Sequence, residues 1–257
     1  MLNAQTHHYD SESDKTDGVD LSSYASFLKT FPLQGDHLFS TLFERHSDVV
    51  QTEKEKFAVA NLNKILDATF DISSKSGFDK MSLRDLSKRA GMSMGAIYSC
   101  ISKKEDIALM VADIVRLSSE STIKQTKKFE TVREQLEQTI RFNLYSTTLL
   151  QPWYFFLYFE TRTLPIQQQN ESKKIETTAI QFFKELIDRG IDSGEFQCDE
   201  PSVVANMIVV LIQDWYLKPW KYKAFGVNSV NQEKAIEDFY CSMIKNIETL
   251  LSIGTRP

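Results

Sequence analysis

The chain has 257 residues, of which 42% are hydrophobic and 25% are charged, and its formal net charge is −5. This apolar content excludes an intrinsically disordered chain, and the length is sufficient for a substantial core in one or two domains. No apolar run reaches the roughly 18 residues that a membrane-spanning helix needs, so we expect no membrane partner. The cysteines, Cys100, Cys198 and Cys241, are far apart and form no metal or redox pair, which favours a reduced cytoplasmic location.

The charge is unevenly distributed along the chain. Residues 1–50 contain three basic and eight acidic residues, whereas residues 51–105 contain ten basic and seven acidic ones. The remainder contains 17 basic and 20 acidic residues. The only segment with a net positive charge is therefore 51–105, which is the expected footprint of a nucleic-acid-binding segment.

The sequence argues against an enzyme. All four histidines lie at or before His46, so the rest of the chain has none for general-base catalysis or metal binding. No GxSxG motif, phosphate loop or HExxH motif occurs. We therefore predict no catalytic residue, no metal site and no cofactor.

The first fifty residues divide into two parts. Residues 1–20 are acidic, with little apolar content, and predict a mobile tail in which His7 and His8 are solvated. Residues 21–50 carry aromatic and aliphatic residues at helical spacing on both sides of Pro32, which predicts an extension of two short helices. This extension could pack on the body or cover part of a partner subunit. Its only cations, Lys29 and Arg45, make membrane-surface binding a weak alternative.

The next segment predicts three helices that share a core. Thr52 and Glu55 predict the start of a long helix, and Ser76-Gly77 its end. Ser82, with Asp85 three residues later, predicts a second start, and Gly91 a tight helix end. A short helix follows through residues 96–98, and Ser102 with Glu105 predicts the start of the next. The expected core of this unit is Leu62, Leu66, Phe70, Phe78, Leu83, Leu86, Ile97 and Ile101.

Two short helices joined by a glycine-containing turn are typical of a helix-turn-helix that reads DNA. The segments SLRDLSKRAGMS (82–93), GAIY (95–98) and KEDI (104–107), together with Gly77, resemble the DNA-binding domain of TetR-family repressors, over about residues 55–110. The resemblance implies double-stranded DNA as partner. It also implies base contacts from Met94, Gly95 and Ala96, supported by Arg84, and phosphate contacts from Ser82, Ser93, Tyr98, Lys103 and Lys104.

Side chains at 94–96 offer almost no hydrogen bonds, so Arg84 is the expected base reader, with DNA shape and half-site spacing adding specificity. Cys100 stands where the family often has a DNA-contacting histidine, which predicts the loss of one phosphate contact. Ile101 stands where the family often has phenylalanine, which is a tolerable exchange in a core.

From residue 105 onward the pattern predicts helices and no strand. The expected helices are 105–119, 131–150, 152–165, 170–190, 201–217 and 229–251, which makes about nine core helices plus the extension. The fold class is all-α: a three-helix, homeodomain-like helix-turn-helix domain, then a helical ligand-binding and dimerisation domain, with a helical N-terminal extension. The expected boundaries are 1–20 (tail), 21–50 (extension), 51–108 (DNA-binding domain) and 109–257 (ligand-binding and dimerisation domain).

The resemblance further implies a homodimer, built by the last two helices, and a small-molecule effector. The residues expected in the dimer are Met207, Leu211, Phe239, Tyr240, Met243 and Ile247. The body contains a dense set of aromatic residues, which includes Tyr216, and the charged residues available near them are Glu160, Arg162 and Asp214. Such a composition predicts an apolar ligand site. The residues expected to bind the ligand are Phe142, Tyr145, Trp153, Phe156, Phe159, Arg162 and Trp215.

The segments FETRTLP (159–165), GIDSGEF (190–196) and DWYLK (214–218) are similar to regulators of fatty-acid and other acyl metabolism. The leading expectation is a repressor that a long-chain acyl compound, or its coenzyme A thioester, releases from a near-palindromic operator. Two alternatives stay open: a repressor that responds to drugs or hydrophobic cations, and a helical protein-interaction module without specific DNA readout.

Overall fold

In the computed structural model, residues 18–52, 54–224 and 232–252 are described, and all regular structure in these ranges is helical. The expected all-α class is therefore confirmed. Nearly all of the expected acidic tail lies outside the described residues, and so does Ser229, where we expected the last helix to begin. Among the described residues, no helix combines the length and apolar character needed to cross a membrane.

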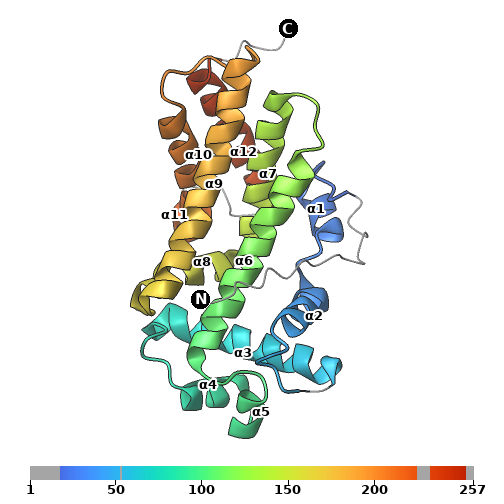
Figure 1. The fold of residues 1–257 in the computed structure, drawn as a ribbon, viewed down its shortest axis with the longest axis vertical. Coiled ribbons are helices and arrows are strands. Elements are labelled where there is room, and N and C mark those ends of the chain that lie inside the picture. Colours follow the sequence, from blue (N-terminus) through green and yellow to red (C-terminus); the bar gives the residue numbers. More distant parts are fainter. Residues whose placement is uncertain (1–17, 53, 225–231, 253–257) are drawn as a thin grey trace, which may run out of the picture.

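Three helices form a small unit at one end of the molecule, namely α3 (Glu55–Ser76), α4 (Leu83–Ala90) and α5 (Met94–Tyr98) (Figure 1). The expected helix ends hold, because Gly77 ends α3 with a φ of 87° and Gly91 ends α4 with a φ of 64°. Six of the eight expected core residues are fully buried, and Phe70 and Leu83 are partly buried against them. This unit positions α5 at the end of the molecule.

The body consists of the helices that follow in chain order: α6 (Lys104–Thr126), α7 (Val132–Leu149), α8 (Gln151–Glu160), α9 (Ile166–Asp192), α10 (Pro201–Leu217), α11 (Pro219–Ala224) and α12 (Gln232–Leu250). A short 3₁₀ helix, η1 (Thr161–Thr163), separates α8 from α9. Helix α6 begins in the α3–α5 unit, passes the expected boundary at residue 108 and continues into the body (Figure 1). One continuous helix thus joins the two parts.

Several helix boundaries differ from expectation. Helix α3 has Lys54, and not Thr52, as its N-cap. Helix α8 ends at Glu160 and not at 165, and α9 begins at Ile166 and not at 170. The expected start at Ser102 with Glu105 was wrong, because the carboxylate of Asp106 instead accepts the backbone N–H groups of Ser102 (2.8 Å) and Lys103 (3.0 Å). Helix α6 extends seven residues past the expected end at 119, to Thr126. Helix α9 does not stop at Gly190. A Cβ atom at Gly190 would lie 2.0 Å from the ring of Phe196, so this glycine allows close packing and does not end the helix.

The N-terminal extension forms the two helices expected, α1 (Tyr24–Thr30) and α2 (Gly35–Arg45). Figure 1 shows α1 beside α7 and α2 beside α6, above α3. Helix α1 buries Tyr24 and Phe27 against the body, as does Phe31 directly after it, and α2 buries Leu38, Phe39 and Leu42. Of the two placements left open for the extension, the structure shows the first, packing on its own chain.

Candidate nucleic-acid interface and internal cavity

Helices α4 and α5 meet in the geometry of a helix-turn-helix. The hydroxyl of Ser82 accepts the backbone N–H of Asp85 (3.2 Å) and donates to its carboxylate (2.6 Å), which fixes the start of α4. The hydrogen bonds that the carboxylate of Asp85 accepts from the hydroxyl and the backbone N–H of Ser82 lower the pKa of Asp85. The hydroxyl of Ser93 accepts the backbone N–H of Ala96 (3.2 Å), which fixes the start of α5. Both serines are exposed, so the two helix starts face solvent.

The residues expected to contact bases lie together on the exposed side of this unit. Gly95 is exposed, whereas Met94 and Ala96 are half-buried, and the side chain of Ile97 is fully buried beneath them. Tyr98 is 50% exposed, so its ring and hydroxyl are available to a phosphate. Cys100 is fully buried, and the expected loss of a phosphate contact at that position stays a prediction.

The two arginines of α4 differ in whether their guanidinium groups are paired with a carboxylate. Arg89 donates its Nε to Asp71 at 2.6 Å, and this hydrogen bond, together with one from Lys75, lowers the pKa of Asp71 to about 2. Arg84 is exposed, and within the described part of the chain it has no hydrogen bond or ion pair. Arg84 is therefore the arginine of α4 that can reach an external partner.

Lys104 is engaged inside the unit. Its ammonium group donates to the carbonyls of Phe78 (3.2 Å), Asp79 (2.8 Å) and Met81 (3.3 Å), and it lies 5.3 Å from the centre of the Phe78 ring. It therefore holds the loop before α4 in place. The neighbouring Lys103 is exposed and remains available for a phosphate.

Two further lysines follow the segment that contacts the end of α5, and the sequence alone did not single them out. The chain before α3 contacts the end of α5, because Gln51 donates its backbone N–H to the carbonyl of Ser99 at 2.9 Å. Thr52 donates its hydroxyl to the same carbonyl at 3.3 Å. Lys54 and Lys56 follow directly and are exposed. The net positive charge of residues 51–105 pointed to this region, but the position of the two lysines could be seen only in the fold.

The helix-turn-helix unit contacts the body through α8. The carboxylate of Glu160, the last residue of α8, accepts the backbone N–H of Phe78 at 2.7 Å. The ring of Phe156 packs edge-on against Phe78 (4.9 Å between ring centres) and Phe70 (5.9 Å). A displacement of α8 would therefore also displace the loop that precedes α4.

A cavity of about 80 Å³ lies in the body between α6, α7, α8, α9 and α10. Its lining is mainly apolar and aromatic, with hydroxyl and amide groups and one carboxylate; the residues are Val115, Ser119, Asn143, Thr147, Tyr154, Leu157, Tyr158, Ser172, Ile175, Glu176, Ala179, Phe183, Val209, Ile212, Gln213 and Tyr216. Glu176 is exposed and accepts the side-chain amide of Gln213 at 2.9 Å. Burial raises the pKa of Tyr216, so its hydroxyl stays neutral. Among the residues that the structure describes, no lysine or arginine lines the cavity.

The residues expected to bind the ligand lie elsewhere. Phe142 and Tyr145 pack against the aromatic rings of α1, and Trp153 and Phe156 pack at the junction with α3. Trp215 packs against Phe239, while Phe159 packs against Phe155 and Tyr158, and Arg162 is exposed; none of the seven lines the cavity. Tyr216, from the same aromatic set, does line it. Periodicity could not separate these positions, because both kinds face the interior of the body.

The residues expected in the dimer divide in two. Tyr240, Met243 and Ile247 are buried within the chain, where they hold α12 on its own body. Met207 is 41% exposed, and Leu211 and Phe239 are half-buried. Val203 (52% exposed) and Val210 (57% exposed) lie one turn to either side of Met207 on α10 and complete an exposed apolar stripe.

Comparison with family models gives two matches. Residues 65–111 match the model of bacterial regulatory proteins of the tetR family, and residues 130–220 match the model of a tetracycline repressor-like C-terminal domain. The first match contains α4 and α5, and the second contains α8 and most of the cavity lining. A search of curated proteins found no match.

Solved structures share the fold at low sequence identity. A bacterial regulatory protein of the tetR family from Rhodococcus RHA1 is 14% identical, with a TM-score of 0.60 over 76% of this chain and 98% of that one. AibR, solved with isovaleryl coenzyme A and operator DNA, is 16% identical, with a TM-score of 0.60 over 76% and 100%. FadR from Bacillus subtilis, solved with stearoyl-CoA, is 18% identical, with a TM-score of 0.54 over 73% and 98%.

Proposed function

The chain belongs to the TetR family of DNA-binding transcriptional regulators, and we propose that it is a homodimeric repressor that a small apolar molecule releases from a near-palindromic operator. The observation that carries the proposal is the exposed face of α4 and α5, where Arg84 has no partner among the described residues and lies beside two exposed helix starts. Helix starts present free N–H groups to phosphates, and an unpaired arginine can read guanine. The proposal assigns no catalytic residue, metal or cofactor to the chain, and it places the protein in the bacterial cytoplasm, with its DNA.

Phosphate binding is assigned to Ser82, Ser93, Tyr98 and Lys103, with Lys54 and Lys56 added beside them. Lys104 moves from a phosphate contact to an internal support of the loop before α4, because three backbone carbonyls already accept its protons. Base contacts are assigned to Arg84 and to the apolar surface of Met94, Gly95 and Ala96. Arg84 accordingly sets the sequence preference, and the phosphate contacts set the overall affinity.

The second copy is proposed to pack on the α10 stripe of Val203, Met207 and Val210, next to Leu211 and Phe239. An exposed apolar stripe on a helix is a common site of association. A two-fold dimer would place two α5 helices about one turn of DNA, roughly 34 Å, apart. Tyr240, Met243 and Ile247 then support the interface from below by holding α12 in place.

The effector is proposed to enter the cavity between α6 and α10. Pockets for drug-sized ligands usually enclose about 300–1,000 Å³, so a cavity of about 80 Å³ must widen to accept one. Widening moves α6 and α8, and α8 carries Glu160 and Phe156 at the helix-turn-helix unit. Ligand binding would shift the spacing of the two recognition helices and lower the affinity for DNA.

Two effector classes compete, and each has support. Acyl-CoA compounds are bound by FadR and AibR, which share this fold. The lining of this cavity favours the rival, an uncharged or cationic apolar molecule, because Glu176 is the only charged residue among the described residues that line it, together with three tyrosines (Tyr154, Tyr158 and Tyr216). Aromatic faces attract cations, whereas the phosphates of coenzyme A need cationic partners.

A panel of ligands separates these classes. The thermal shift of the dimer is measured with palmitoyl-CoA, isovaleryl-CoA, tetraphenylphosphonium and a neutral aromatic hydrocarbon. We expect tetraphenylphosphonium to raise the melting temperature of the wild type, and to do so less in Glu176→Gln. Stabilisation by an acyl-CoA alone would instead assign the site to acyl compounds.

A further inference from the structure

The N-terminal extension lies outside both segments that match the family models, since α1 and α2 end before residue 65. It nevertheless contacts both parts of the protein. Helix α1 packs on α7 and α12, whereas α2 packs on α3 of the helix-turn-helix unit and on α6. An added segment that touches both parts can transmit movement between them.

Helix α1 fastens the extension to the body. The ring of Phe27 packs edge-on against Phe142, with 5.5 Å between ring centres, and the ring of Phe31 does so at 5.7 Å. Arg141 donates to the carbonyl of Leu21 at 3.1 Å. Both phenylalanines are essentially buried, so α1 is an integral part of the body.

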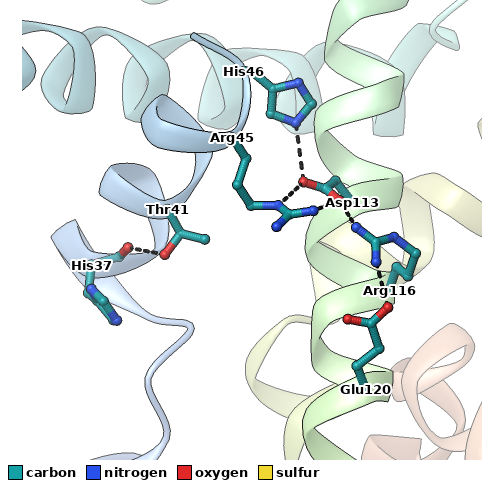
Figure 2. A network of polar contacts seen from close by, with 7 residues as sticks. All are labelled: His37, Thr41, Arg45, His46, Asp113, Arg116 and Glu120. Carbon is teal, nitrogen blue, oxygen red and sulfur yellow. Dashed lines mark hydrogen bonds and ion pairs between the residues drawn. The ribbon is translucent and has the colours of Figure 1, made fainter. Parts of the chain in front are cut away.

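The other end of the extension is fastened to α6 by an ion-pair network, which Figure 2 shows. Arg45, at the end of α2, donates hydrogen bonds to both carboxylate oxygens of Asp113 in α6, at 2.6 and 3.0 Å. His46 lies 3.4 Å from the same carboxylate, and Arg116 also contacts it. Burial alone would raise the pKa of Asp113, but the contact with the His46 ring and the hydrogen bonds from Arg45 and Arg116 hold it well below its ordinary value.

The same stretch of α6 forms part of the cavity wall. Val115 and Ser119 line the cavity, whereas Asp113, within the same turns, binds Arg45 of α2. Helix α6 therefore meets the proposed effector on one face and the extension on another. A displacement of this stretch by a ligand would pull on Arg45.

Helix α2 then leads to the helix-turn-helix unit. It buries Leu38 and Leu42 and packs along α3. The ring of Phe39 also contacts Trp153 of α8 (6.3 Å between ring centres), and Trp153 packs against Phe70 of α3 (5.2 Å). A shift of α6 can thus be transmitted through α2 to α3.

We propose that the extension is a second coupling path between the cavity and the DNA-binding helices, in which Arg45 and Asp113 carry movement of α6 through α2 to α3. This inference rests on the proposed function. It assigns Arg45 and Asp113 a role in the response to the effector and none in contacting DNA. Breaking the pair should therefore reduce the response and leave the DNA affinity of the unliganded protein nearly unchanged.

The experiment replaces the ligand with a side chain, because Ala179 lines the cavity and Ala179→Phe fills it. The dissociation constant for a duplex enriched from a random library is measured for the wild type, Ala179→Phe, Arg45→Gln and the double variant. We expect Ala179→Phe to weaken binding about tenfold, within the usual range of allosteric coupling. In the Arg45→Gln background the same change should weaken binding less than about threefold.

Lys29→Gln is the matched control, because it removes one positive charge from an exposed position of α1. Ala179→Phe should keep its full effect in that background. An equal effect of Ala179→Phe with and without Arg45 would overturn the coupling path, even if Arg45→Gln lowers the melting temperature, since that result describes a purely structural brace. If Arg45→Gln does not fold, Asp113→Asn takes its place in the cycle.

Failure of the proposed function gives a different result. A wild type that enriches no duplex contradicts the regulator itself. A wild type that binds a duplex, but whose affinity Ala179→Phe does not change, contradicts the cavity as effector site and overturns the coupling inference with it.

Discussion

The contact between Glu160 and Phe78 gives a sharp prediction for the junction of the two parts. Glu160→Gln keeps the size of the side chain and removes the charge from the oxygen that accepts the Phe78 N–H at 2.7 Å. A hydrogen bond to a charged group contributes about 1.5–3 kcal/mol, and a neutral one about 0.5–1.5 kcal/mol. Because the site is only partly buried, we expect a loss of about 1 kcal/mol, which corresponds to about a fivefold change in the local opening equilibrium.

Hydrogen exchange measures this opening at the bond itself. The amide of Phe78 should exchange about fivefold faster in Glu160→Gln than in the wild type. Glu171→Gln is the control, because Glu171 is exposed on α9 and the same charge is removed there. Unchanged exchange at Phe78 in Glu160→Gln, with exchange elsewhere also unchanged, would refute the assignment of this contact as a junction bond.

Three further predictions follow from the geometry. Arg84→Ala should cost about 1–3 kcal/mol at one base pair of the operator, measured over single-base variants, whereas Arg89→Ala should leave base preference unchanged because Arg89 binds Asp71. Gly190→Ala should destabilise the fold by about 1–3 kcal/mol in urea, through the 2.0 Å clash with Phe196, and Phe196→Leu in the same chain should recover part of the loss. The free energy of unfolding should differ most between wild type and Asp113→Asn near neutral pH, and this difference should shrink as the pH falls below about 4. The reason is that the lowered pKa of Asp113 gives a stabilisation that protonation removes. A difference that grows on acidification would contradict the network.

The helix-turn-helix could be predicted from sequence because its signals are local. Ser82 with Asp85 and Gly91 each act within one turn of chain, and both formed as expected. The helix start near residue 103 was misplaced by one position because Glu105 and Asp106 are adjacent carboxylates, and only the packing of α6 selected the buried Asp106.

The cavity and the role of the extension could not be predicted in the same way. Phe142 and Tyr216 are both aromatic, on adjacent faces of a helical body, yet one packs under α1 and the other lines the cavity. The difference depends on where α1 docks, which is a contact between residues more than a hundred positions apart. Likewise, nothing around Lys104 in the sequence indicates that its ammonium group binds three carbonyls of a distant loop.

The most direct test of a regulator that reads DNA is selection from a random duplex library at a fixed salt concentration. We expect the wild type to enrich a near-palindrome with half-sites about one helical turn apart, and Arg84→Ala to lose preference at one position of each half-site. A wild type that binds all duplexes with equal, weak affinity would contradict it.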